Sequence, residues 1–160
     1  MIKQYSSIIK NKDFKNLWLG QILSQISLNM LCFVLAIWVY QETKSNAAVS
    51  FMLLAFSIPS IIIGFLAGGI VDRFDKRSIL YYCNLSRALI LLFFFFYARN
   101  LVALFALAVI ISIITQFFIP AEAPFIPRLV AKVQLLAANS LFTVSYNLST
   151  VIGFIIAGRC

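Results

Sequence analysis

The sequence predicts an all-α protein, a polytopic bundle of about five transmembrane helices. Of its 160 residues, 62% are hydrophobic and 11% are charged, whereas soluble domains average about 45–50% apolar and about 25% charged residues. A water-soluble fold of this length could not bury so much apolar surface, so lipid must solvate the chain. The apolar stretches are long and continuous, which favours helices over the short alternating strands of a membrane barrel.

Five segments are long enough to cross the hydrocarbon core, which takes roughly 20 residues. We expect the spans at residues 17–40, 48–71, 78–98, 101–119 and 140–158. The first is not the core of a signal peptide, because it is too long and no small-residue cleavage site follows it. Pro120, Pro124 and Pro127 predict that the fourth span ends at about residue 119, since proline blocks helix continuation.

Basic residues concentrate on one side of the predicted bundle. That side carries nine of them: Lys3, Lys10, Lys12, Lys15, Arg73, Lys76, Arg77, Arg128 and Lys132. The other side carries three, namely Lys44, Arg99 and Arg159. Cytoplasmic loops retain excess Lys and Arg, so we expect a multi-pass protein of a bacterial inner (plasma) membrane with its N-terminus in the cytoplasm. The net charge of +8 then reflects topology and attraction to anionic lipid, and no nucleic-acid partner is expected.

The densest charge cluster is the stretch GGIVDRFDKRS, in which two acids and three bases lie between Asp72 and Arg77. One interpretation is a simple positive-inside anchor between two spans. An anchor needs no acids, however. Nor does it need Gly68 and Gly69, small residues that let two helices approach closely.

This stretch resembles the signature loop between the second and third helices of the twelve-helix transporters of the major facilitator superfamily. The family pattern is Gly, three residues, Asp, a base, one residue, Gly and two bases. The matching residues are Gly68, Asp72, Arg73, Lys76 and Arg77, and Asp75 replaces the second glycine. The resemblance implies a conformational latch, in which these charges bind the other half of the transporter and hold its inward side closed.

More of the chain resembles the drug- and siderophore-exporting branch of that family, which includes macrolide efflux pumps. The stretches that carry this likeness are NLWLGQILSQIS and QFFIPAEAPFIPRLVAKVQLLAANSL. The resemblance covers less than half of a complete member, so residues 1–160 would form part of an N-terminal bundle whose C-terminal transporter half is missing. It implies a small hydrophobic or amphipathic substrate, bound near the midplane between two bundles and exposed alternately to each side.

Polar stripes run along the first, fourth and fifth predicted helices, and the resemblance makes them the candidate substrate path. Their members are Gln21, Ser24, Gln25, Asn29, Ser112, Thr115, Gln116, Thr143, Tyr146, Asn147 and Thr150. Polar groups in hydrocarbon are costly unless they face protein or a water-filled path. Hydrogen bonding between helices would use the same stripes, so both roles remain open.

Three other features concern helix ends and isolated charges. Arg87 lies within the third span, and we expect its side chain to snorkel to the cytoplasmic surface, with pairing to an acid of the loop as the alternative. Glu122 is expected in water at the membrane interface. Gly153 and Gly158 resemble the helix-kink motif of antiporters, although Phe154 replaces its proline, which leaves the kink open.

An enzyme is not expected from the residues available. The chain has no histidine, no cysteine cluster with metal spacing and no glycine loop for phosphates, so neither a metal nor a cofactor is expected. Without an ATP site, transport would depend on an ion gradient. Two alternatives to a transporter remain: a truncated remnant without transport activity, and a small membrane interaction protein.

Overall fold

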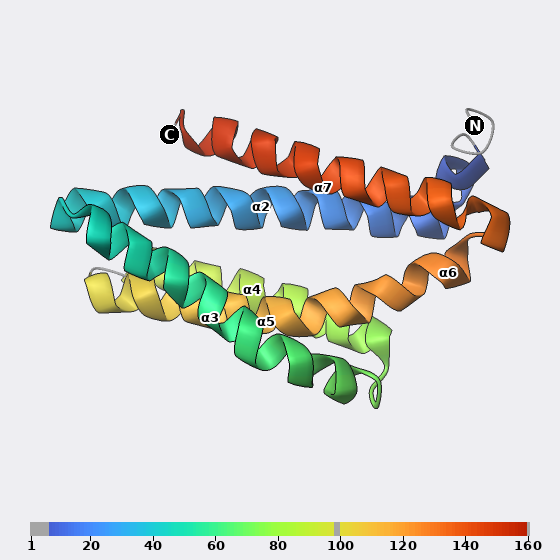
Figure 1. Cartoon of the computed structure of the whole chain (residues 1–160), viewed down its shortest axis with the longest axis horizontal. Helices are drawn as coiled ribbons and strands as arrows, with labels where there is room; N and C mark the ends of the chain where they lie inside the picture. Colours follow the sequence, from blue (N-terminus) through green and yellow to red (C-terminus); the bar gives the residue numbers. More distant parts are fainter. Residues whose placement is uncertain (1–6, 98–99, 160) are drawn as a thin grey trace. The chain divides into compact units, whose positions relative to one another are not determined.

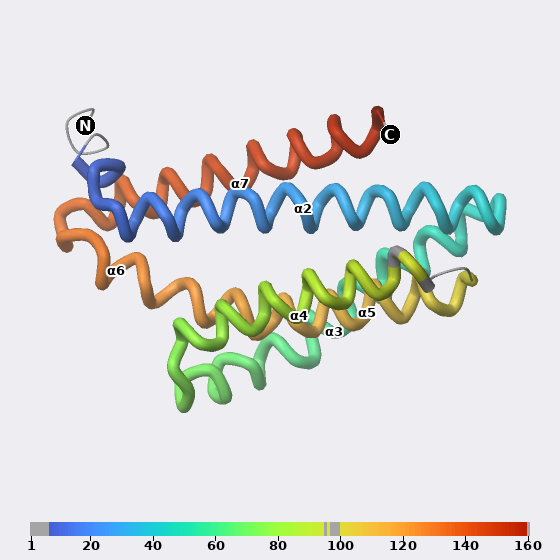
Figure 2. The backbone as a smooth tube through the Cα atoms, turned by 180° about the vertical axis from the view of Figure 1, so that it is seen from behind, coloured from blue at the N-terminus to red at the C-terminus, as the bar shows by residue number. Residues whose placement is uncertain are grey.

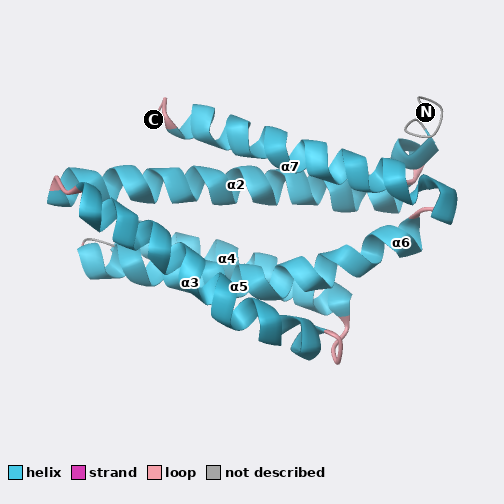
Figure 3. Ribbon diagram, in the orientation of Figure 1, coloured by secondary structure: helices cyan, strands magenta, loops and turns pink. Residues whose placement is uncertain are grey.

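The computed structural model describes residues 7–97 and 100–159, so Lys3, Arg99 and Cys160 lie outside the described residues. Its long helices are α2 (Lys12–Thr43), α3 (Asn46–Val71), α4 (Lys76–Tyr97), α5 (Leu101–Glu122) and α7 (Leu135–Ala157). Short helical segments η1 (Ala123–Phe125), α6 (Ile126–Leu129) and η2 (Lys132–Gln134) join α5 to α7. The described residues contain no strand (Figure 3), which confirms the predicted all-α class.

The predicted spans 17–40, 48–71 and 101–119 fall on α2, α3 and α5. The spans 78–98 and 140–158 fall on α4 and α7 except for their last residues, of which residue 98 lies outside the described residues. By length and composition, four helical stretches of the described chain can cross a membrane, at Lys12–Thr43, Asn46–Val71, Leu101–Leu129 and Lys132–Ala157. The 22-residue α4, which carries Asn84 and Arg87, is not among these four. Large apolar side chains cover the outside, and Phe65 is 90% exposed, as expected for a surface in contact with lipid.

Local sequence accounts for several helix ends. Ser45 caps α3, where its side chain accepts a hydrogen bond from the amide of Ala48, and Asn100 caps α5 through the amide of Ala103. A side-chain acceptor at this position satisfies an amide that has no partner within the helix. Between α2 and α3, Lys44 adopts the left-handed conformation with φ of 52°, and its amide bonds Tyr40 O at 2.7 Å.

The predicted end of the fourth span is wrong by three residues. Helix α5 continues through Pro120 to Glu122, because a membrane helix tolerates a proline whose freed carbonyl is satisfied elsewhere. The regular helix ends only where Pro124 follows in η1. Pro127 lies in the first turn of α6, where its missing amide costs no helical hydrogen bond.

The chain divides into two compact units, which we describe separately. The terminal unit consists of the residues up to Val34 and those from Pro124 onward. In it, α7 runs beside α2 in the same direction (Figure 1). Six residues form its buried core: Ile8, Phe14, Ile126, Ala137, Ala138 and Phe142. The rings of Phe14 and Phe142 meet edge to face, with centroids 5.7 Å apart.

The central unit consists of Leu35–Ala123 and includes α3, α4 and α5. Helix α5 packs against both of the others, parallel to α3 and antiparallel to α4 (Figure 2). Buried residues of α5 include Leu104, Leu107, Ala108 and Ile111. The turn between α3 and α4 therefore lies at the same end of this unit as Glu122.

Candidate functional site

In the terminal unit, the polar stripes of α2 and α7 meet at one pair of side chains. Asn29 Nδ2 donates to Thr150 Oγ1 at 3.3 Å and to Gln25 O, in the preceding turn of α2, at 2.8 Å. A second link between these helices joins Trp18 Nε1 to Ser145 Oγ at 2.8 Å. The hydrogen-bonding role that the sequence left open is therefore present at Asn29 and Thr150.

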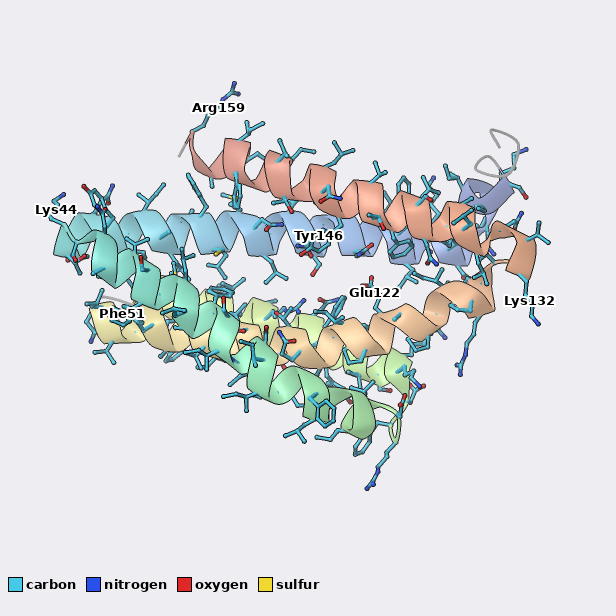
Figure 4. All side chains as sticks on the ribbon, in the orientation of Figure 1. Lys44, Phe51, Glu122, Lys132, Tyr146 and Arg159 are labelled. Atoms are coloured by element: carbon cyan, nitrogen blue, oxygen red, sulfur yellow. The ribbon has the colours of Figure 1, made fainter. Side chains whose placement is uncertain are left out.

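The remaining stripe residues of α7 have no hydrogen bond to α2 among those of the described residues. Thr143, Tyr146 and Asn147 are exposed, and Figure 4 labels Tyr146 on α7. Asn147 Nδ2 donates to Thr143 O of its own helix, at 2.9 Å. On α2, Gln21, Ser24 and Gln25 are partly exposed. These polar groups remain candidates for a substrate path.

In the central unit, the stripe of α5 contacts its neighbouring helices. Ser112 is 2% exposed and donates to Phe56 O of α3. Gln116 Oε1 would lie 3.3 Å from a Cβ added at Gly64 of α3, so this glycine makes room for the glutamine. A small residue at this position lets the two helices approach closely.

Arg87 is buried rather than snorkelling, which corrects the sequence-based expectation. It is 5% exposed, and its Nη2 donates to Thr115 Oγ1 of α5 at 3.1 Å. Its guanidinium carbon lies 4.7 Å from the ring centroid of Phe118, a cation–π geometry. Thr115 in turn donates to Ile111 O at 2.7 Å. Packing against α5 holds the guanidinium inside the unit.

Glu122, which Figure 4 labels on the last turn of α5, attracts the same arginine electrostatically. The residue is only partly exposed, and its Oε1 is buried without a hydrogen-bond partner among the residues described. The expectation of a fully hydrated Glu122 is therefore wrong. Thr115, Phe118 and Glu122 share one face of α5, which is the sequence signal that could have revealed this cluster.

The charged turn holds its two acids in local contacts. Asp72 Oδ1 pairs with Lys76 Nζ at 3.0 Å. Asp75 Oδ2 accepts the amide of Ser78 at 2.9 Å and its hydroxyl at 2.8 Å, so Asp75 caps the start of α4. These hydrogen bonds lower the pKa of Asp75 below its ordinary value. The alternative pairing of Arg87 with an acid of the turn is absent among these contacts.

Two arginines of the turn remain at the surface. Arg73 and Arg77 are both exposed, and Arg77 also attracts Asp75 electrostatically. A Cβ added at Gly68 or Gly69 would meet nothing within 4 Å among the described residues. The close helix approach expected at these two glycines is therefore not made among the described residues.

At the other predicted glycine pair, Gly153 brings α7 close to α2. A Cβ added there would lie 2.9 Å from Asn29 Cβ and 3.0 Å from Ile26 O. One added at Gly158 would lie 3.3 Å from Phe154 O of its own helix and 3.8 Å from the Phe33 ring. Gly153 lies inside the continuous helix α7, so close packing is the role that its geometry supports.

The fold and these contacts define a class, that of a multi-pass membrane protein built from apolar helices with buried polar links. Residues 17–159 match the family model described as Major Facilitator Superfamily. The chain belongs to this superfamily. Its members are transporters, which supports a non-enzymatic role.

Two curated relatives carry the same family description in their names. The chain is 26% identical over 149 residues to "Uncharacterized MFS-type transporter YkuC" of Bacillus subtilis (strain 168), covering 91% of this chain and 35% of the relative. It is also 26% identical over 149 residues to "Uncharacterized MFS-type transporter YfiS" of the same strain, covering 92% and 35%. The chain thus spans about a third of the length of these relatives. No solved structure matches it significantly.

Proposed function

We propose that this chain forms the first part of a secondary active transporter that exports small hydrophobic or amphipathic compounds, such as antibiotics. Alternating access, driven by an ion gradient, would move the compound across the bacterial inner membrane. Superfamily membership supports transport, and the likeness of the two quoted stretches to the drug-exporting branch supports the direction and the cargo.

The observation that carries this proposal is the charged turn between α3 and α4. Its acids are engaged by Lys76 and Ser78, whereas Arg73 and Arg77 are exposed at the surface. Exposed guanidinium groups on a short, capped turn can form ion pairs with a partner surface, and Arg77 has only the nearby charge of the hydrogen-bonded Asp75 to leave. In the latch role, the partner would be acidic groups of the other transporter half.

The substrate path would use the polar groups that the helix contacts leave available. On α7 these are Thr143, Tyr146 and Asn147, and on α2 they include Gln21, whose Oε1 is buried without a hydrogen-bond partner in the described part of the chain. Ser112 and Thr115 already bind neighbouring helices, so a path role for them would require those contacts to open.

Accumulation of an amphipathic fluorescent compound in cells tests the proposal. Cells that produce the native gene product containing this chain should accumulate less of the compound than cells without it. Arg77→Gln should abolish the difference, because the latch loses a charge. Lys10→Gln removes a base from the same predicted side and should leave the difference intact. Equal accumulation with and without the product would favour the non-transporting remnant.

A further inference from the structure

An apolar groove of about 320 Å³ lies entirely within the central unit. The end of α3, the first half of α4 and the middle of α5 form its walls, including Ile70, Phe74, Tyr82, Cys83 and Phe117. This volume falls at the lower end of the range of about 300–1,000 Å³ that is usual for small-molecule sites. None of the lining residues belongs to the proposed substrate path, so the proposed function does not account for this groove.

Hydrocarbon suits this groove better than water does. Among the lining residues, the hydroxyls of Ser86 and Tyr82 are the polar groups that could hold a water molecule firmly. An ordered buried water usually needs two to four polar partners. At the rim, Phe74 is 64% exposed and Tyr82 is 62% exposed. An apolar hollow with an exposed aromatic rim, on helices that lipid surrounds, fits an acyl chain.

The charged turn contributes Phe74 to the groove and places positive charge beside it. Phe74 of the groove directly follows Arg73, and Arg77 lies three residues further on. Asp72 is paired with Lys76, and Asp75 caps α4, whereas Arg73 and Arg77 are exposed. Arg87 also lies near the groove residue Cys83, but it is buried and donates to Thr115, so the two exposed arginines are the cations that a headgroup can reach. Guanidinium groups bind phosphate through paired hydrogen bonds.

We propose that the groove and these arginines together bind one anionic phospholipid. Its acyl chain would occupy the groove, and its phosphate would contact Arg73 and Arg77. A headgroup with net negative charge, such as that of phosphatidylglycerol, would be preferred over the neutral headgroup of phosphatidylcholine. This inference does not depend on which compound the protein transports, or on whether it transports any.

Two native cysteines allow a direct test on the unmodified chain. Cys83 lines the groove, whereas Cys32 lies on α2, outside its lining. The protein in detergent is titrated with phosphatidylglycerol, and the alkylation rate of each cysteine by N-ethylmaleimide is followed peptide by peptide. Phosphatidylglycerol should slow alkylation of Cys83 and leave the rate at Cys32 unchanged. An unchanged rate at Cys83 throughout the titration would overturn the proposal.

Charge variants then test the headgroup. Each arginine should raise the affinity for phosphatidylglycerol roughly fivefold. The double variant R73Q/R77Q should therefore need about 25-fold more phosphatidylglycerol for the same protection of Cys83. The matched variant K10Q/K15Q removes equal charge away from the groove and should change this concentration less than twofold. Helix content by circular dichroism must agree between the two variants. Equal protection by phosphatidylcholine at the same concentration would contradict selection of an anionic lipid.

Discussion

Arg87 shows how a cation is held inside an apolar bundle. Its guanidinium has a hydroxyl partner in Thr115, the π face of Phe118 and the opposite charge of Glu122, all on α5. A buried charge is costly unless such groups replace its hydration. Sequence alone identified Arg87 as exceptional. The shared face of Thr115, Phe118 and Glu122 can be read from the sequence, but its pairing with Arg87 depends on the register between α4 and α5, which side-chain packing along both helices sets.

Removing Arg87 should therefore destabilise the protein strongly. Arg87→Ala removes the charged hydrogen bond to Thr115 and the contact with the Phe118 ring, and we expect a loss of about 3 kcal/mol in the free energy of unfolding. Thr115→Val removes one charged hydrogen bond and should cost about 1.5 kcal/mol. Equilibrium unfolding in mixed micelles, followed by circular dichroism, gives both values.

The exposed Arg128 provides the control for these substitutions. Arg128→Ala should change the free energy of unfolding by less than about 0.5 kcal/mol. A similar loss from Arg87→Ala and Arg128→Ala would mean that the contacts of Arg87 with α5 contribute nothing to stability. The double variant Arg87→Leu with Glu122→Leu should be more stable than the sum of the single losses indicates, because the two charges are coupled.

At the scale of elements, α4 begins where Asp75 caps it. The sequence comparison identified Asp75 only as a departure from the glycine of the family pattern. The structure gives it a role, since its carboxylate accepts both the amide and the hydroxyl of Ser78. An N-cap three residues before a serine can be recognised in sequence. Whether the side chain adopts that rotamer depends on the turn that precedes it.

The cap predicts a pH dependence of the first turn of α4. The pKa of Asp75 is lowered in the folded protein, so the cap is present above the ordinary pKa and is lost as pH falls through the lowered value. Amide exchange at Ser78, corrected for intrinsic rates, should therefore accelerate at acidic pH, below about 4. Asp75→Asn keeps an acceptor and should remove this pH dependence. Unchanged protection of Ser78 in Asp75→Ala at neutral pH would contradict the cap.

The contact between α2 and α7 depends on the missing side chain at Gly153. Gly153→Val should lower the free energy of unfolding by about 2 kcal/mol, since the added atoms overlap Asn29 Cβ and Ile26 O. Gly69→Val is the matched control, because an added Cβ there meets no atom within 4 Å among the described residues. Thermal unfolding of the two variants side by side measures the difference. Equal midpoints would show that α7 does not pack on α2 through this glycine.

The helices themselves were the most predictable elements. Long apolar stretches define their approximate positions, because each must satisfy its backbone hydrogen bonds inside lipid. Their ends were less predictable. The last turn of α5 continues past Pro120, and α2 begins five residues before the predicted start at residue 17. Polar and charged residues lie within these turns, where hydropathy gives no boundary.

For the whole molecule, the distribution of basic residues predicts which side each turn faces. Single cysteines at Phe74 and Val133, in a background without native cysteines, should react with an impermeant maleimide only when the cytoplasmic side is exposed. A cysteine at Ser45 should react only from outside. Intact cells and inside-out vesicles provide the two measurements. The reverse pattern would show that the excess of Lys and Arg does not set the orientation.

The central claim is that this chain is part of a gradient-driven exporter, and transport by the purified native gene product tests it most directly. The mass of that product is determined first and compared with the 18.0 kDa of this chain. When the product is reconstituted in proteoliposomes and an ion gradient is imposed, it should move an amphipathic fluorescent compound against the concentration gradient of that compound. Transport should stop when an ionophore abolishes the ion gradient. Transport of the compound at the same rate with and without the ion gradient would contradict the account. So would the absence of transport by a correctly folded product.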